Sequence, residues 1–238
     1  GEAAAYFDPE NVDEMTAVAQ ETGMALAEAF MYRHHPQTKL VGDIVRSGSL
    51  GDILLVRATF QFAFNSRENV RLVPEYGGGS LWDVGVYPVS FAQFVMGGAP
   101  TAVFGEQWLG PTGVDESFSG QMVYGDGRTA QISCAFRAPW HTWAEILGTD
   151  GRLTLNRPFV ALDQNRQLLF HHASGEVEEI PVPEKELYLG EVEDMQAAIL
   201  DSQPNYLTLA ETREHVRTVL ALYASAKSGQ VQQLTVNS

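Results

Sequence analysis

The sequence has little cysteine, little basic charge and no long apolar run. Cys134 is its one cysteine among 238 residues, so no intrachain disulfide can form, and a reducing, cytoplasmic location is expected. Lys and Arg total 15 against 30 for Asp and Glu, a formal net charge of −15, which disfavours nucleic acid and anionic membrane surfaces as partners. No apolar segment approaches the ~18 residues of a membrane span, and no signal-peptide pattern opens the chain.

The sequence also lacks a Gly-x-Gly-x-x-Gly dinucleotide fingerprint. Its glycine triplet, Gly77 to Gly79, is followed by no lysine of the kind found in phosphate-binding loops, so we interpret it as a point of close backbone approach at the edge of a pocket. Histidine pairs stand at 34–35 and 171–172, but adjacent side chains of an extended chain point to opposite faces and chelate poorly. No metal site is therefore predicted.

Hydrophobic periodicity predicts an alternation of helices and strands, then a run of strands, then two helices. Tight turns between the later strands indicate an antiparallel sheet. Pro88 cannot donate a backbone hydrogen bond, so its helix should kink there. The expected elements are helices over 11–23, 37–47 and 77–96, strands over 24–30 and 53–64, short strands over 101–182, and helices over 188–202 and 208–228.

Apolar stripes indicate which faces of these elements are buried. Cys134 alternates with polar neighbours and shares a strand face with Ile132 and Phe136, so a buried structural thiol is expected rather than a nucleophile. In the first helix and in the 188–202 helix, apolar residues recur at helical spacing and are expected to face inward. These residues are Val12, Met15 and Val18, and Val192, Met195 and Ile199.

The order of elements predicts an α+β fold. A large, open, mostly antiparallel sheet is backed by helices and is preceded by a helix–strand remnant of a Rossmann domain. The remnant covers residues 1–35, and the α/β substrate-binding and oligomerisation domain covers 36–238. Because the 24–30 strand has no parallel neighbours in this chain, we expect that segment to be displaced, mobile or paired with another molecule.

The stretch from Gly77 to Pro88 carries the sharpest chemical signal. Asp83 and Tyr87 lie four residues apart, so a helix presents a carboxylate and a phenol on one face. Such a pair can orient a substrate hydroxyl and exchange its proton. The alternatives are a half-buried tyrosine with its hydroxyl bonded internally and a carboxylate that only satisfies the helix N-terminus.

Several segments, in order, resemble the C-terminal domain of the Gfo/Idh/MocA oxidoreductases. They are Glu28 to Gln37, Gly77 to Pro88, Val114 to Gly120 and Cys134 to Trp140. Tyrosine rather than histidine at position 87 points toward the dihydrodiol dehydrogenase and glucose–fructose oxidoreductase branch. The resemblance implies hydride transfer between NAD or NADP, held by an N-terminal Rossmann domain, and a sugar, polyol or dihydrodiol-like hydroxyl. It also implies a homo-oligomer that pairs through the open face of the sheet.

The resemblance further implies residue roles. Tyr87 would exchange the proton and Asp83 would orient the substrate. Arg33 would meet substrate oxygens or the nicotinamide side of the cofactor, and Glu28 would lie on the cofactor side. The remaining substrate-pocket candidates are His35, Arg137, Trp140 and Tyr188.

A lysine that lowers the tyrosine pKa belongs to a Glu-Lys-Pro motif in this family, and here its position is Ala3. Two hypotheses follow. The chain is the substrate-binding part of an NAD(P)-dependent oxidoreductase, inactive alone because fingerprint and lysine are absent, or it is a non-catalytic carbohydrate-binding or dimerisation module derived from that family.

Overall fold

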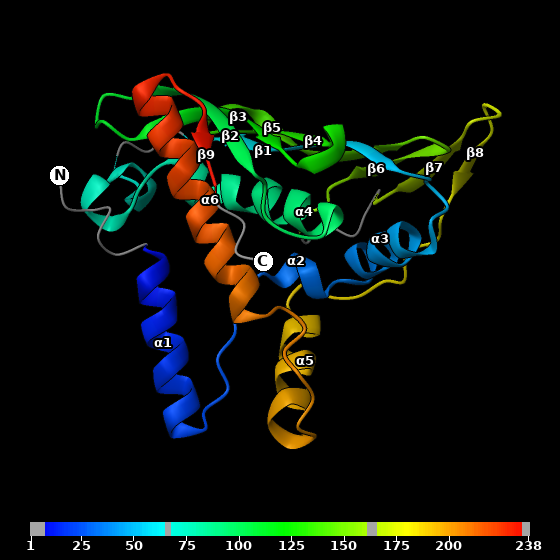
Figure 1. The fold of residues 1–238 in the computed structure, drawn as a ribbon, viewed down its shortest axis with the longest axis horizontal. Helices are drawn as coiled ribbons and strands as arrows, with labels where there is room; N and C mark the ends of the chain where they lie inside the picture. The colour runs from blue at the N-terminus through cyan, green and yellow to red at the C-terminus, as the bar shows by residue number, and fades with distance from the viewer. Residues whose placement is uncertain (1–7, 65–67, 161–165, 235–238) are drawn as a thin grey trace.

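A single large sheet forms one layer of the molecule, and the helices lie on one side of it (Figure 1). The computed structural model describes residues 8–64, 68–160 and 166–234. Within these residues the sheet has the order β8-β7-β6-β5-β1-β4-β3-β2-β9, and every neighbouring pair whose direction is assigned is antiparallel except β1 with β4. The predicted α+β class with an open, mostly antiparallel sheet is confirmed.

The strands agree closely with the predicted alternation. Tight turns at 125–127 and 149–151 join β3 to β4 and β5 to β6, in agreement with the expected antiparallel sheet. The strands are β1 (Ile53–Ala63), β2 (Ala102–Leu109), β3 (Asp115–Val123), β4 (Thr129–Ala135), β5 (Arg137–Gly148), β6 (Gly151–Asn156), β7 (Leu168–His172), β8 (Val177–Glu179) and β9 (Gln232–Gln233).

The helices begin and end at capping residues. Thr208 and Glu211 form a capping box at the start of the last helix. Asp8 and Asn11 form another at the start of the first helix, which therefore begins before the expected residue 11. The helices are α1 (Pro9–Thr22), α2 (Met31–His34), α3 (Pro36–Ser47), α4 (Val86–Met96), α5 (Leu189–Leu200) and α6 (Leu209–Ser228). Short 3₁₀ turns are η2 (Val70–Leu72), η3 (Pro74–Tyr76) and η5 (Gly125–Gly127), and η4 (Leu81–Gly85) is a π-helical turn. No helix among the described residues is both long and apolar enough to cross a bilayer.

The core lies between the sheet and the helices α4 and α6. The alternation of side chains along β5 shows this. Ala144 and Ile146 are fully buried on one face of the strand, whereas Leu147 points to the other face and is 36% exposed. Cys134 is buried in the same core, as predicted. One face of the sheet is thus packed and the other is open.

Three expectations about the N-terminal part and α5 are wrong. Residues 24–30 form no strand; they run as an extended segment whose Leu26 carbonyl accepts a hydrogen bond from Asn205 Nδ2 (2.6 Å), since no neighbouring strand is there to pair with them. Met15 and Val18 of α1, and Val192 and Ile199 of α5, are all more than half exposed. Figure 1 shows why, because α1 and α5 both extend away from the sheet layer.

A matched pair of substitutions tests the assignment of the two sheet faces. Ile146→Ala removes a fully buried side chain and is expected to lower the free energy of unfolding by roughly 2–4 kcal/mol. Leu147→Ala, one residue further on the open face, is expected to cost less than about 1 kcal/mol. Urea denaturation measures both, and equal losses would show that the open face is also covered in solution.

Candidate functional site

The segment that carries Asp83 and Tyr87, residues 80–96, is anchored at its start by Asp115 of β3. One carboxylate oxygen, Oδ2, accepts hydrogen bonds from Ser80 Oγ (2.7 Å) and from the Leu81 amide (2.8 Å). The other, Oδ1, accepts one from the Tyr223 hydroxyl of α6 (2.6 Å). Burial raises the pKa of Asp115, and these donors oppose that shift. The carboxylate therefore ties the helix start to β3 and α6 at once.

The glycine triplet fits around this anchor. Gly79 has φ +133°, and a Cβ there would lie 2.2 Å from Asp115 Oδ1, so only glycine is accommodated. The amides of Gly77, Gly78 and Gly79 donate to the carbonyls of residues 74, 73 and 71. Because all three amides are used internally, the triplet offers no phosphate cradle, in agreement with its interpretation as a point of close backbone approach.

The helix does not simply kink at Pro88. A π-helical turn, η4, precedes α4, and Asp83 lies in it. Pro88 has no amide to bond the preceding turn, and a widened turn is one way for the backbone to adjust. The side chains of this segment that recur at helical spacing are packed inward, namely Leu81, Val84, Pro88, Phe91 and Val95.

Asp83 is held by an arginine that the sequence did not single out. Arg71 of η2 donates from Nε to Asp83 Oδ2 at 2.6 Å. The Asp83 side chain remains 26% exposed, so it can still meet a ligand. A charged pair of this kind fixes the orientation of the carboxylate.

Tyr87 lies in a pocket of aromatic rings. The rings of Phe30, Tyr32, Phe60 and Phe159 surround it with centroid separations of 5.3, 5.7, 5.5 and 5.9 Å. Its hydroxyl donates to the Met31 sulfur (3.6 Å). An internal partner was one of the alternatives for this residue, and a thioether is a weak acceptor that a substrate oxygen could replace.

The environment of Tyr87 keeps its phenol neutral. Burial raises its pKa to about 12, and the negative charge of Asp83 acts in the same direction, followed by Tyr188 and Glu191. Arg71 opposes the shift. The family lysine position, Ala3, lies outside the described residues. Tyr188, another predicted pocket residue, lies at the N-terminal end of α5 with its side chain exposed, and its substrate role stays a prediction.

Three other predicted residues have internal partners. Arg33 is 2% exposed, donates to Glu211 Oε1 (3.0 Å) and stacks on Phe94. His35 caps α3 by accepting from the Gln37 amide, and Glu28 contacts His215 (3.2 Å). Their assignments to substrate and cofactor stay predictions.

Arg137 and Trp140 lie near the start of β5 and are exposed. Arg137 stacks on Trp108 (3.7 Å), and Arg157 lies over Trp140 (5.2 Å). Among the residues that the structure describes, no hydrogen bond, ion pair or ring contact joins either of them to Asp83 or Tyr87. Their substrate roles also stay predictions.

Comparison with solved structures identifies the fold. The chain is similar to an aldose-aldose oxidoreductase from Caulobacter crescentus complexed with glycerol, with TM-score 0.88 and 19% identity over 96% of this chain and 69% of that one. It is also similar to KijD10, a 3-ketoreductase from Actinomadura kijaniata in complex with NADP and TDP-benzene, with TM-score 0.82 and 25% identity over 92% and 67% of the two chains. The fold is therefore the one found in this class of sugar oxidoreductases.

Sequence comparison gives the family. Residues 38–154 match the GFO/IDH/MocA C-terminal domain. The chain is 31% identical to D-xylose 1-dehydrogenase (NADP(+)) 2 from Haloferax volcanii over 94% of this chain and 70% of the relative. It is 34% identical to trans-1,2-dihydrobenzene-1,2-diol dehydrogenase from Xenopus tropicalis over 59% of this chain and 42% of the relative. The chain belongs to the Gfo/Idh/MocA family.

The pKa of Tyr87 can be tested directly. The folded chain should show a phenol that ionises with a midpoint of about 12, absent in Tyr87→Phe and shifted to ~10 in denaturant. The folded state thus holds this proton more tightly, so its contribution to stability is present below pH ~10 and is lost as pH rises toward about 12. Tyrosine-ring NMR during an alkaline titration measures it, and a midpoint near 10 in the folded chain would contradict the buried site.

The Asp115 anchor makes a separate prediction. Asp115→Ala leaves three donors without an acceptor and should cost roughly 3 kcal/mol of unfolding free energy. Tyr223→Phe removes one donor and leaves the other two paired, so it should cost about 1 kcal/mol. Denaturant unfolding of both variants checks the ratio, and similar small losses would mean that Asp115 does not anchor the helix.

Proposed function

We propose that this chain is the substrate-binding part of an NAD(P)-dependent oxidoreductase that acts on a hydroxyl of a sugar, polyol or dihydrodiol-like compound. The observation that carries the proposal is the pair Asp83 and Tyr87 on the anchored segment, with the phenol in an aromatic pocket and the carboxylate held by Arg71. The relatives named above include an NADP-dependent xylose dehydrogenase and a ketoreductase solved with NADP, which supports this class of substrate and cofactor.

The site divides its work between two groups. Asp83 accepts a hydrogen bond from a substrate hydroxyl, and Arg71 keeps that carboxylate pointed at one place. Tyr87 hydrogen-bonds the oxygen that reacts: in the direction of carbonyl reduction its neutral phenol, with a pKa raised to about 12, donates the proton to the carbonyl oxygen, and in the direction of hydroxyl oxidation the same proton passes from the substrate hydroxyl back to the phenolate. The surrounding rings of Phe30, Phe60 and Phe159 give an apolar wall against which a sugar ring can stack.

The described residues do not fit the phosphates of a dinucleotide. The amides of Gly77 to Gly79 are bonded to carbonyls, and the predicted cofactor residues Arg33 and Glu28 are engaged by Glu211 and His215. We therefore assign to this chain the substrate and its proton, and no step of the cofactor. A cytoplasmic location, argued from the single buried cysteine, belongs to the same proposal.

The second candidate is a non-catalytic carbohydrate-binding or dimerisation module. The raised pKa of Tyr87 favours it, because burial and the charge of Asp83 outweigh the lowering of this pKa by Arg71. The open face of the sheet would then be the main functional surface. It carries exposed Phe104, Trp108 and Leu147, and a homo-oligomer paired through this face is proposed under either candidate.

Sugar binding to the chain tests the proposal. We expect D-xylose or glycerol to bind saturably and to shift the tyrosine-ring resonance of Tyr87, and Asp83→Asn to weaken that binding about tenfold by removing a charge-assisted acceptor. Asp43→Asn is the matched control, because Asp43 pairs with Arg46 on the exposed face of α3 in the same chemical arrangement.

Each outcome of that experiment decides something. Binding that depends on Asp83, without reduction of NADP⁺, supports a substrate-binding part. Turnover with this chain alone contradicts the restriction to a part, and binding that is indifferent to Asp83→Asn and Tyr87→Phe favours the binding module. The absence of saturable binding by both compounds would overturn the proposal.

A further inference from the structure

The Tyr87 hydroxyl and the Met31 sulfur form a contact that the proposed reaction does not use. Tyr87 donates to Met31 Sδ at 3.6 Å, and this is the one hydrogen bond that the phenol makes among the described residues. A thioether is a weak acceptor, so the phenol is held loosely and stays available to a substrate oxygen. The sulfur therefore lies directly beside the group to which the proposed function assigns the proton.

Small molecules that reach Tyr87 also reach this sulfur. Met31 is the first residue of α2, and its side chain is half-buried against the core. Tyr87 is half-buried as well, whereas Met122 in the same core is fully buried. A site that admits a sugar hydroxyl to the phenol admits a molecule as small as hydrogen peroxide to the neighbouring thioether. Met31 is thus open to modification in the folded chain.

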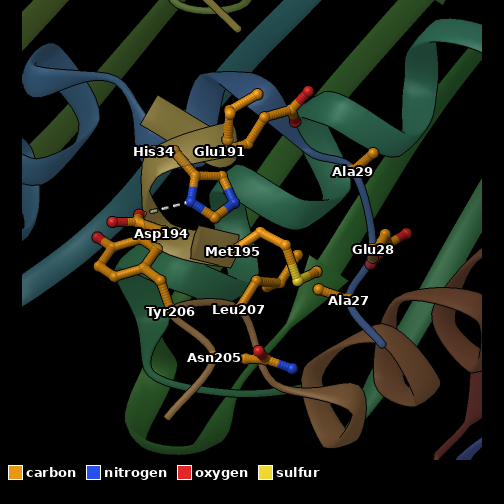
Figure 2. A pocket seen from close by; sticks show the side chains of 11 residues that line it. Ala27, Glu28, Ala29, His34, Glu191, Asp194, Met195, Asn205, Tyr206 and Leu207 are labelled. Carbon is orange, nitrogen blue, oxygen red and sulfur yellow. Dashed lines mark hydrogen bonds and ion pairs between the residues drawn. The ribbon is translucent and has the colours of Figure 1, made fainter. Parts of the chain in front are cut away.

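Met195 provides an internal comparison. It is half-buried like Met31 and lines a mostly apolar cavity of about 270 Å³ between residues 27–29, α5 and residues 205–207 (Figure 2). Figure 2 shows one interaction among the side chains drawn, between His34 and Asp194, and none at the Met195 sulfur. The two methionines therefore share their partial exposure and differ in the hydroxyl that donates to Met31.

Oxidation changes what the Met31 sulfur offers to that hydroxyl. The sulfur attacks one oxygen of hydrogen peroxide, so that a sulfur–oxygen bond forms and the oxygen–oxygen bond breaks. The thioether is oxidised to a sulfoxide, and the peroxide is reduced to water, which carries away both protons. The side chain thereby changes from apolar to polar and carries an oxygen acceptor where it had a weak sulfur acceptor.

The Tyr87 hydroxyl is the donor best placed for the new oxygen. The phenylalanine rings around Tyr87 carry no donor. Tyr32, whose ring also packs against Tyr87, already donates its hydroxyl to Ser90 (2.9 Å). A polar oxygen in apolar surroundings is costly unless it is hydrogen-bonded, and the Tyr87 hydroxyl already points at the Met31 side chain.

We propose that Met31 is a redox modification site: a hydroperoxide converts it to the sulfoxide, and the sulfoxide oxygen then accepts the hydrogen bond of Tyr87 and withdraws that hydroxyl from the substrate. The hydrogen bond between Tyr87 and the sulfoxide is independent of what the chain binds. The loss of substrate contact rests on the proposed function, because it assumes that Tyr87 meets the reacting oxygen.

Peroxide treatment followed by tyrosine-ring NMR and peptide mass spectrometry tests the new hydrogen bond. We expect Met15 and Met24 to gain an oxygen first, because both are more than half exposed, and Met31 to follow. As Met31 reacts, the Tyr87 resonances should move and its hydroxyl proton should exchange with water about tenfold more slowly. Unchanged hydroxyl exchange in chain that carries the Met31 sulfoxide would overturn the proposal, as would a Met31 that stays reduced after Met195 is fully oxidised.

Two substitutions locate the effect. Met31→Leu keeps an apolar side chain of similar volume and removes the sulfur, so peroxide should leave the Tyr87 resonances where they are. Met195→Leu is the matched control, since Met195 is also half-buried, and Tyr87 should respond to peroxide as it does in the unaltered chain. A response of Tyr87 to peroxide that persists in Met31→Leu contradicts the proposal.

Binding of D-xylose separates this inference from the proposed function. We expect the oxidised chain to bind D-xylose about tenfold more weakly than the reduced chain, because the Tyr87 hydroxyl is engaged. Equal binding by both forms overturns the withdrawal of Tyr87 from the substrate and leaves the proposed function standing. Absence of binding by the reduced chain counts against the proposed function, and the exchange of the Tyr87 hydroxyl still decides whether the sulfoxide accepts its hydrogen bond.

Discussion

The carboxylate of Asp115 is the constraint on which the rest of the site depends. It lies at the first residue of β3, yet it bonds the start of η4 and the C-terminal half of α6, so one side chain joins the sheet to two helical elements. Gly79 packs against this carboxylate so closely that no Cβ fits there. The position of Asp115 therefore fixes the start, and with it the direction, of the helical segment that carries Asp83 and Tyr87. A chemical site on a long helix needs such a fixed origin, because a small rotation at the N-terminus would move both side chains away from a bound substrate.

Much of this architecture was predictable from local pattern. Alternation of apolar residues gave the strands, and Gly125 to Gly127 and Thr149 to Gly151 gave the turns between them. The inward-facing residues of the segment 80–96 also follow from helical spacing. These features depend on neighbours in sequence, and periodicity reports them well.

The expectations that proved wrong concern helix faces, because whether such a face is buried depends on tertiary packing and not on the local sequence pattern. Val192 and Ile199 have helical spacing that suits a core, but α5 extends away from the sheet, and nothing in its own sequence states that. The roles of Arg71 and Tyr223 could not be predicted from local sequence for a related reason. Arg71 reaches Asp83 from a short 3₁₀ turn, and Tyr223 reaches Asp115 from 108 residues away, so neither leaves a periodic signal.

Apolar side chains on α1 and α5 remain exposed on the same side of the molecule. Met24, at the start of the extended segment between α1 and α2, is exposed as well. The segment has neither strand partners nor a helix of its own, and two side-chain contacts hold its middle, the hydrogen bond from Asn205 to Leu26 and the contact of His215 with Glu28. This side of the chain is therefore less completely packed than the sheet layer, and local opening should begin there.

The position of β1 has a consequence for how the chain folds. This strand lies in the middle of the sheet, yet Arg57 pairs with Gln131, which is 74 residues later, and with Glu145, which is 88 residues later. The strands β2, β3 and β4, by contrast, are joined to their neighbours by tight connections. Closing long loops costs entropy before any pairing rewards it. The consecutive antiparallel strands β2, β3 and β4 should therefore pair first. The later pairing of β1 with β4 should limit the rate at which the complete sheet forms.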